Sequence, residues 1–399
     1  MTERLKIEHV YKVFAARPTD ALSMLRAGKT KSDVLEKLGQ VVGLDDVSLD
    51  VPSGAMYMIM GLSGSGKSTL ARCINRLNEP SAGRILLDGE DICALDEDAL
   101  RDVRRKRISM VFQHFALLPN RRVIENVEFG LKLRGMTAAQ RRQRAEEVLN
   151  VVGLARWAYH MPHELSGGMR QRVGLARALA TDADVLIMDE AFSALDPLIR
   201  TEMQDELLRL QRTLNKTILF ITHDFQEALK LGTRIAIMSE GRLVREGTPQ
   251  SIVLEPGSDY VAAFTREVDR ARLFDAGSVM TSLVEILRGP DRIVMGDASG
   301  APGPAFVVDG DAQVIGTLSA AQLEAARGGA ALPQPLPAGG FTCVRSDMRL
   351  VDVAGRCGAD GPIGVVDDAG RLVGRLEMGQ MLARIGAAAA ADTNGGRHV

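Results

Sequence analysis

Residues 61–69 read GLSGSGKST and follow a short apolar run, AMYMIM, at residues 55–60. The stretch from Gly61 to Ser68 fits the pattern GxxxxGK[ST], and it lies between a strand-like run and a helix-forming segment. Glycines let backbone N–H groups converge on phosphate oxygens, and the helix that follows presents its positive end to them. The sequence therefore predicts a strand, a phosphate-binding loop and a helix here.

The loop residues are candidate nucleotide ligands: Gly61, Leu62, Ser63, Gly64, Ser65, Gly66, Lys67, Ser68 and Thr69. Lys67 can reach the β- and γ-phosphates, and the Ser68 hydroxyl can bind Mg²⁺. An ordinary glycine-rich turn would give no reason for a lysine and a hydroxyl in this register.

An acidic pair follows a second apolar run, VLIMDE, at residues 185–190. Four apolar residues suit a strand that is buried on both faces, so Asp189 and Glu190 emerge at its carboxyl end, where open α/β sheets bind ligands. We expect Asp189 to associate with Mg²⁺ and Glu190 to orient or deprotonate an attacking water. The alternative is an acidic pair that merely ends a strand.

Composition sets wide limits on what the chain does. Its 399 residues suffice for two or three domains, and a net charge of −2 argues against a global basic field for nucleic acid. The four cysteines stand far apart without a CxxC pair, which disfavours disulfides and a zinc site and favours a reducing, cytosolic compartment. No signal-like leader and no run of about 18 apolar residues is found, so we expect no membrane crossing by this chain.

Strand and helix patterns alternate along most of the chain. Residues 1–14 are expected to form an exposed-edge strand, residues 17–40 two short helices, and residues 120–180 a mostly helical region. Thr19 or Asp20 would cap the first short helix, and Thr30 or Ser32 the second. Buried-looking strands between helices indicate a parallel sheet covered by helices.

Further motifs occur in a fixed order around the two described so far. They are Gln113 in VFQHFALLP, LSGGMRQR at residues 165–172, SALD at residues 193–196, and His223 in ITHD. The complete set resembles the ATP-binding subunit of an ABC transporter. The resemblance implies an ABC ATPase domain over residues 1–270, with a RecA-like core, an antiparallel β subdomain, a helical insertion at 15–42 and a helical subdomain at about 114–180.

The same resemblance assigns further roles. Ser166, Gly167 and Gly168, the signature residues, would cap an ATP held by the phosphate loop of another subunit, which implies a head-to-tail homodimer around two ATP molecules. Asp196 would connect the two sites, and His223 would hold the γ-phosphate and Glu190 in place.

Two more nucleotide contacts are implied. Gln113 would sense Mg²⁺ and water, so the expected catalytic residues are Glu190, His223, Lys67 and Gln113, and the expected metal ligands are Ser68, Gln113 and Asp189. Adenine stacking would fall to Phe14, with Tyr11 as the alternative.

The layout of residues 1–270 is similar to the ATP-binding subunits of glycine betaine/proline and other quaternary-amine importers. This similarity implies a separate integral membrane permease, a solute-binding receptor acting through it, and a peripheral position at the cytoplasmic face of the inner membrane. The similarity does not distinguish betaine, choline, proline and carnitine as the transported solute, because no residue of this chain contacts the solute. The alternative is a soluble ABC ATPase in DNA repair or translation, for which the basic run RDVRRKR (101–107) could be cited; we interpret it as a solvated face and expect no nucleic-acid partner.

Glycine, alanine and proline rise after about residue 270, and two similar units appear. They read GPAFVVDGDAQVIGTLSAAQL and GPIGVVDDAGRLVGRLEMGQML, each predicting strand, Asp-containing turn, strand and helix. Residues 275–386 resemble a pair of cystathionine-β-synthase (CBS) domains, a smaller α/β region that would either sense ionic conditions or serve packing and dimer stability. Residues 387–399 are expected to be a disordered tail.

Overall fold

The structure is a computed structural model, and its chain divides into two compact units, residues 1–264 and residues 265–399. It describes residues 3–112, 116–193, 195–289, 291–297, 304–328, 340–357 and 361–386.

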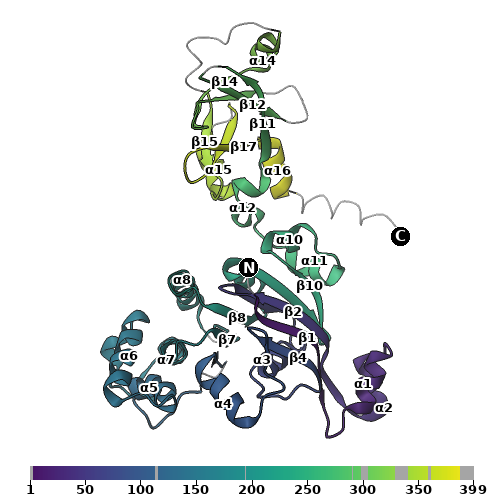
Figure 1. The fold of residues 1–399 in the computed structure, drawn as a ribbon, viewed down its shortest axis with the longest axis vertical. Helices are drawn as coiled ribbons and strands as arrows, with labels where there is room; N and C mark the ends of the chain where they lie inside the picture. The colour runs from purple at the N-terminus through teal and green to yellow at the C-terminus, as the bar shows by residue number, and fades with distance from the viewer. Residues whose placement is uncertain are drawn as a thin grey trace. The chain divides into compact units, whose positions relative to one another are not determined.

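A mostly parallel sheet forms the centre of the first unit, with strand order β10-β9-β3-β8-β7-β6 (Figure 1). Its strands are β3 (Met56–Met60), β6 (Ile108–Val111), β7 (Val185–Asp189), β8 (Thr217–Thr222), β9 (Arg234–Ser239) and β10 (Arg242–Gly247), of which β10 pairs antiparallel. Every residue of β3, β7 and β8 is buried. Such continuous apolar strands fit a parallel sheet that is covered on both faces.

An antiparallel sheet lies against the first, with strand order β2-β1-β4-β5. Its strands are β1 (Glu3–Phe14), β2 (Val41–Pro52), β4 (Ala82–Leu87) and β5 (Glu90–Asp91). The expectation of an edge strand at residues 1–14 is wrong, because β1 pairs with β2 on one side and β4 on the other. Leu5 and Ile7 on β1 are fully buried. The alternation of apolar and polar residues in this strand therefore means that one side faces the core, and it does not mean that the strand lies at the edge of the sheet.

Helix α3 (Lys67–Ile74) packs in the core that the two sheets share. Leu70, Ala71, Cys73 and Ile74 belong to one buried cluster with side chains of β1, β3 and β8. This packing fixes the start of α3, and therefore the loop before it, against both sheets.

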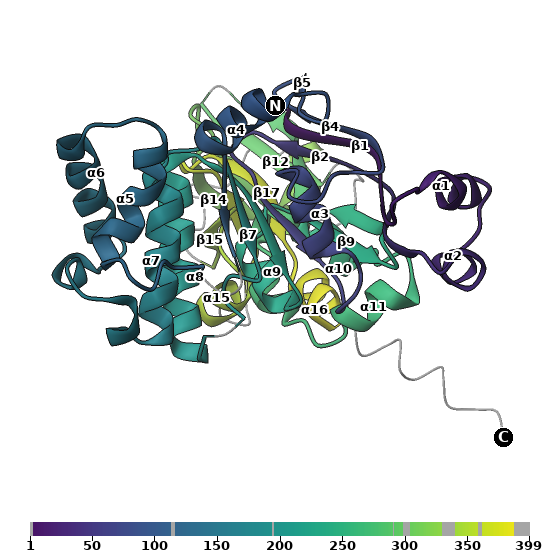
Figure 2. The ribbon, with the colours of Figure 1, turned by 90° about the horizontal axis from the view of Figure 1, so that it is seen from below.

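The remaining helices of the first unit gather in separate places. They are α4 (Glu97–Lys106), α5 (Val123–Leu133), α6 (Ala138–Val151), α7 (Gly167–Ala180), α8 (Pro197–Leu214), α9 (Phe225–Leu231), α10 (Pro249–Leu254) and α11 (Asp259–Thr265). Helices α5, α6 and α7 pack on one another at one side of the unit, and a hairpin of α1 (Thr19–Arg26) and α2 (Lys31–Leu38) stands at the opposite side (Figure 2).

The two short helices of the insertion form as expected, but only one of the expected caps does. Thr30 caps α2 by accepting a hydrogen bond from the Asp33 N–H, and the Asp33 carboxylate accepts one from the Thr30 N–H. Pro18 precedes α1 without a side-chain cap, so Thr19 and Asp20 lie inside that helix and do not cap it.

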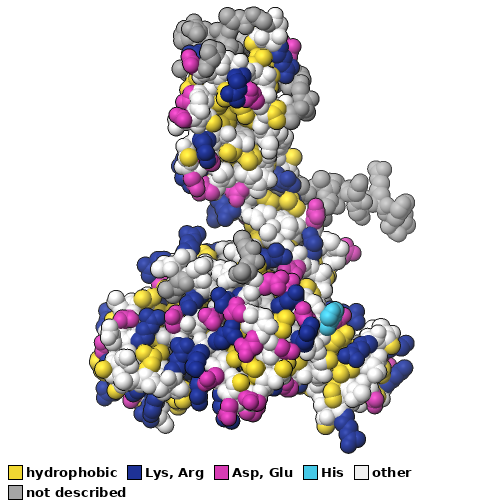
Figure 3. Space-filling model, in the orientation of Figure 1, with side chains coloured by type: hydrophobic (Ala, Val, Ile, Leu, Met, Phe, Trp, Pro, Cys, Tyr) yellow, Lys and Arg dark blue, Asp and Glu magenta, His cyan; other side chains and the backbone are white. Residues whose placement is uncertain are grey.

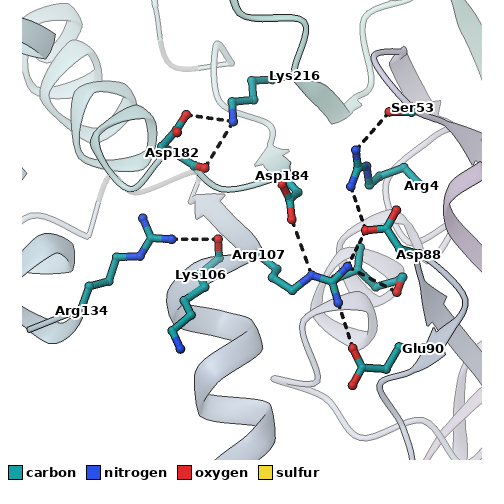
Figure 4. Close-up of polar contacts among 11 residues, drawn as sticks. Arg4, Ser53, Asp88, Glu90, Lys106, Arg107, Arg134, Asp182, Asp184 and Lys216 are labelled. Carbon is teal, nitrogen blue, oxygen red and sulfur yellow. Dashed lines mark hydrogen bonds and ion pairs between the residues drawn. The ribbon is translucent and has the colours of Figure 1, made fainter.

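Charged side chains join the antiparallel sheet to the parallel sheet at the end away from the phosphate loop. The Arg107 guanidinium, between α4 and β6, contacts the carboxylates of Asp88, Glu90 and Asp184 (Figure 4). Asp88 also pairs with Arg4 on β1 at 2.8 Å. Because each partner is partly exposed, the network contributes modestly to stability, and it serves mainly to fix the relative position of the two sheets.

The second unit is a sheet with strand order β14-β13-β12-β11-β17-β16-β15. Its strands are β11 (Thr281–Arg288), β12 (Ile293–Asp297), β13 (Ala305–Val308), β14 (Val314–Leu318), β15 (Thr342–Arg345), β16 (Ile363–Val366) and β17 (Leu372–Leu376). Its helices are α12 (Arg270–Leu273), α13 (Ala276–Val279), α14 (Ala320–Arg327), α15 (Leu350–Arg356) and α16 (Met378–Gly386).

The internal repeat has the same local geometry in both copies. Asp309 accepts hydrogen bonds from the N–H groups two and four residues later, at 3.0 and 2.9 Å, and Asp367 does the same at 2.9 Å each. Each Asp thereby closes the turn between two antiparallel strands, β13–β14 and β16–β17. The turns also touch, since Leu372 N–H donates to the Ala312 carbonyl at 2.9 Å.

Within the described ranges, no helix combines the length and the apolar character that a membrane crossing requires.

Candidate functional site: a phosphate loop and its acidic partners

The loop between β3 and α3 has a conformation that its glycines permit. Gly64 and Gly66 adopt φ values of +80° and +102°, which side chains with a Cβ rarely adopt. A Cβ on Gly66 would also lie 2.7 Å from the Gly43 carbonyl oxygen of β2, and one on Gly61 would collide with the Met238 carbonyl oxygen of β9. The loop is therefore held between backbone segments on two sides.

Lys67 lies across the inside of this loop. Its Nζ donates to the carbonyl oxygens of Gly61 and Leu62 at 2.8 Å each, and it lies 3.4 Å from the Ser65 hydroxyl. Burial lowers the pKa of the Lys67 ammonium, and the nearby carboxylates of Glu190 and Asp189 act in the opposite direction. A buried ammonium at the mouth of converging N–H groups suits a strongly anionic ligand.

An aromatic hydroxyl distant in sequence supports the loop. The Leu62 N–H donates to the Tyr260 hydroxyl at 3.3 Å, and that hydroxyl donates to the Met238 carbonyl at 3.3 Å. Tyr260 lies on α11 and packs edge-on against Phe264. Sequence reasoning missed this residue, because a tyrosine 198 positions from Leu62 carries no local signal.

Ser68 and Asp189 meet at the start of α3. The Ser68 hydroxyl donates to Asp189 Oδ1 at 2.8 Å, which brings two oxygen ligands together at the carboxyl end of β7. Burial raises the pKa of the Asp189 carboxyl, while the Ser68 hydrogen bond opposes that shift. Oxygen ligands of this kind fit Mg²⁺, which takes one or two protein groups and completes its shell with phosphate oxygens and water.

Glu190 and His223 lie beside each other at the ends of neighbouring strands. Glu190 has a φ of +46°, an unusual value for a residue with a side chain, and its N–H donates to the Ile221 carbonyl at 3.0 Å. His223 Nδ1 is 3.6 Å from Glu190 Oε1. The strained backbone turns the Glu190 side chain toward the cavity that the phosphate loop lines.

That cavity has a volume of about 620 Å³ and runs from the phosphate loop to the aromatic residue at the end of β1. From the loop and α3 it is lined by Ser63, Gly64, Gly66, Lys67, Ser68 and Thr69. Phe14 lines the other end, is 47% exposed and lies over Gly43. Tyr11 is 8% exposed and packs in a cluster with residues of α1 and α2, away from the cavity.

The signature residues lie elsewhere in the same chain. Ser166 caps α7 by accepting from the Met169 N–H at 3.3 Å, and Asp196 caps α8 by accepting from the Ile199 N–H at 3.0 Å. A Cβ on Gly168 would lie 2.8 Å from the Ile199 side chain, so this glycine permits the close approach of α7 and α8. Ser166, Gly167, Gly168 and Asp196 do not line the cavity described above.

Gln113 lies outside the described residues. Ala116 is the next described residue, and its carbonyl accepts a hydrogen bond from the Arg177 guanidinium of α7 at 2.6 Å. Helix α7 therefore carries the signature residues at its start and contacts Ala116 near its end.

The sheet, the glycine loop after its β3 strand, the buried Lys67 and Asp189, and the Ser68 hydroxyl that donates to Asp189 define a P-loop nucleotide-binding protein. A family model described as ABC transporter matches residues 44–193. The glycine betaine transport ATP-binding protein OpuAA of Bacillus subtilis is 44% identical over 95% of this chain and 91% of its own length. The glycine betaine/proline betaine transport system ATP-binding protein ProV of Escherichia coli is 52% identical over 70% of each chain.

A solved structure gives the same answer for the fold. The dimeric structure of MJ0796, a bacterial ABC transporter cassette, is 33% identical, covers 61% of this chain and 98% of its own, and aligns with a TM-score of 0.53. The chain belongs to the family of ABC transporter ATP-binding proteins, whose members hydrolyse ATP to drive transport. The expected α/β ABC ATPase fold is confirmed.

The buried acid at the site gives a pH-dependent prediction. Because the pKa of Asp189 is raised in the folded chain, its stabilising contribution is complete below the unfolded pKa of about 3.9 and is lost as pH rises through the folded pKa. We therefore expect Asp189→Asn to raise the urea midpoint of the nucleotide-free chain at about pH 7, with a gain that shrinks toward about pH 4.

Urea unfolding at both pH values measures this effect, and Asp98→Asn, at an exposed carboxylate on α4, is the control. An Asp189→Asn chain that is no more stable than the parent at neutral pH would contradict the prediction.

Proposed function

We propose that this chain hydrolyses ATP to power the import of glycine betaine and related quaternary amines through a separate membrane permease. One observation carries the chemistry: the buried Lys67 and the Ser68–Asp189 hydrogen bond lie beside Glu190, and Lys67, Ser68 and Glu190 line one cavity of about 620 Å³. The solute is supported by the glycine betaine relatives, which match over most of the chain.

ATP would lie along the cavity with its phosphates at the loop and its base at Phe14. The N–H groups of residues 61–69 and the Lys67 ammonium would bind the β- and γ-phosphates. Phe14 offers a half-exposed ring for stacking adenine, whereas Tyr11 is buried in the core, so we assign the base contact to Phe14.

Ser68 and Asp189 are the residues that would hold Mg²⁺, with Gln113 as a third ligand by its position in the motif. When bound, Mg²⁺ supplies positive charge beside the phosphates. The Ser68 hydroxyl oxygen and the Asp189 carboxylate oxygen, which lie 2.8 Å apart, are the ligand types that Mg²⁺ prefers.

Glu190 is placed to orient the attacking water or to accept its proton. His223, 3.6 Å from the Glu190 carboxylate, would hold that side chain and the γ-phosphate in one arrangement. Attack of the water oxygen at the γ-phosphorus breaks its bond to the bridging oxygen and leaves ADP and phosphate.

Replacing Glu190 with Gln keeps the shape of this side chain but removes its basicity. We expect hydrolysis to fall by about 10²-fold or more while ATP binding persists. In cells that lack their own glycine betaine uptake, the parent chain with its permease should restore uptake of labelled glycine betaine, and Glu190→Gln should not. Full hydrolysis by the variant would remove Glu190 from this role.

The signature residues require a second copy of the chain. Ser166 and Gly167 are exposed at the start of α7, where free N–H groups of the helix can meet a γ-phosphate, yet they do not line the cavity of their own chain. In a head-to-tail homodimer, each signature would close the ATP site of the other copy, and Asp196 at the start of α8 would lie between the two sites. The dimeric cassette structure supports this assembly.

Mixed dimers test the shared site. In a dimer of one Lys67→Ala copy and one Ser166→Ala copy, both lesions fall at one ATP and the other site is intact. We expect such mixed dimers to bind about one ATP each, whereas either variant alone binds ATP weakly at both sites. A mixture that binds no better than its two parents would contradict the head-to-tail arrangement.

A partner permease and its receptor would place the chain at a membrane. Coupling to a permease is a property of the family, and we assign this chain to the cytoplasmic face of the inner membrane as a peripheral subunit. The surface from residue 116 to residue 165, which includes α5 and α6, would receive a cytoplasmic helix of the permease.

The alternative of a DNA-repair or translation factor loses its supporting feature. The basic run 101–107 is neutralised locally, since Arg101 pairs with Asp98, and Arg105 and Lys106 both pair with Asp102. On the face drawn in Figure 3, basic and acidic side chains intermingle over the first unit. The relatives named above are transport proteins, which favours import.

For residues 275–386 we propose a CBS-like pair that makes transport respond to ionic conditions. The pair itself is supported by the two matching Asp turns, which give β13–β14 and β16–β17 the same geometry, and by the position of both strand pairs in one sheet. The alternative role is packing or dimer stability.

Deleting residues 275–399 separates these roles. We expect the shortened chain to hydrolyse ATP and to support glycine betaine uptake that no longer changes with external salt. Uptake assays over a range of salt concentrations measure this response. An unchanged salt response would exclude sensing by this unit.

A further inference from the structure

The helical hairpin of the insertion borders the nucleotide cavity. Helix α2 contributes Lys31, Ser32 and Leu35 to the same lining that contains Phe14 and the phosphate loop. The hairpin leaves the sheet directly after Phe14 and rejoins it at Val41, which also lines the cavity. The insertion therefore lies beside the place where the base and ribose of a bound nucleotide would lie.

Helix α2 is held firmly in that position. Its Val34 side chain is fully buried against a cluster that includes Tyr11 and Leu25, so the opposite side of the helix cannot turn inward. The reciprocal hydrogen bonds of Thr30 and Asp33 fix its first turn. Lys31 Nζ lies 3.7 Å from Glu240 Oε2 in the turn between β9 and β10, which links the helix to the parallel sheet.

Apolar side chains that face this end of the cavity are unusually exposed. Phe14, Leu35 and Val41 are 47%, 52% and 54% exposed, and all three line the cavity. Three large apolar side chains around one hollow favour a flat apolar ligand group, and a nucleobase is such a group. Ser32, Lys31 and Glu240 add a hydroxyl, an ammonium and a carboxylate, which suit the hydroxyl groups of a ribose.

We infer that α2 forms a second wall of the base-binding end, where Leu35 packs against the nucleobase together with Phe14 and Ser32 hydrogen-bonds a ribose hydroxyl. This inference rests on the proposed function, because it takes the base to lie at Phe14. It makes the insertion a determinant of nucleoside affinity, acting on the base and the ribose and leaving phosphate binding to the loop.

The test compares ATP with inorganic tripolyphosphate, which has the phosphates but no nucleoside. In the non-hydrolysing Glu190→Gln chain, we expect Leu35→Ala to weaken ATP binding about fivefold, because it removes about half of a leucine's apolar contact. Tripolyphosphate binding should stay within about twofold of the parent value. Calorimetric titration of each ligand gives both dissociation constants.

Leu38→Ala is the matched control, since Leu38 is an exposed leucine on the same helix that does not line the cavity. Leu38→Ala should leave both ligands unaffected, and Phe14→Ala should weaken ATP selectively, as Leu35→Ala does. If Leu35→Ala binds ATP as tightly as Leu38→Ala, the inference fails. Equal weakening of ATP and tripolyphosphate would also overturn it, because that result means damage to the phosphate loop.

Two further measurements complete the design. Ser32→Ala should abolish any preference of the parent for ATP over 2′,3′-dideoxy-ATP, and a preference that survives this change removes Ser32 from the ribose contact. Lys67→Ala should weaken both ATP and tripolyphosphate. If Lys67→Ala leaves ATP binding intact, the proposed site itself is wrong; if it abolishes binding while Leu35→Ala has no effect, only the role of α2 is wrong.

Discussion

The close backbone packing around the β3–α3 loop is the constraint on which the site depends. Gly61 lies against the Met238 carbonyl and Gly66 against the Gly43 carbonyl, so the backbones of β9 and β2 contact the loop on two sides. No side chain fits at these points, and the positive φ at Gly66 adds a second reason for glycine. With the loop fixed, α3 starts in the shared core, and Ser68 reaches Asp189.

This arrangement buries ionisable side chains, which lowers the stability of the fold unless a ligand pairs with them. Lys67 and Asp189 are both buried. Burial lowers the pKa of Lys67 and raises the pKa of Asp189, and both shifts favour the neutral form of the side chain. The backbone of Glu190 is strained beside them. Such groups lower the stability of an empty site and are stabilised by a ligand of opposite charge, which ties the energetics of the fold to nucleotide binding.

Local patterns predicted the parts of the site that lie within one strand–loop–helix unit. The phosphate loop, the buried β7 ending in Asp189, and the helical insertion could all be recognised in the sequence, because apolar periodicity and glycine placement act over short distances. Sequence reasoning failed where tertiary pairing decides: β1 is an inner strand, and Thr19 does not cap α1. The approach of α2 to the cavity depends on where a whole hairpin folds back, which no local pattern encodes.

The hydroxyl of Tyr260 bears on how far the chain can be truncated without losing a support of the phosphate loop. The parallel sheet is complete at Gly247, so a fragment cut there would keep every strand and every motif of the nucleotide site. It would lose α11, and with it the hydroxyl that accepts from the Leu62 N–H. A fragment that keeps this support of the loop therefore extends at least to Phe264, whose ring packs against Tyr260, and does not end at the last strand.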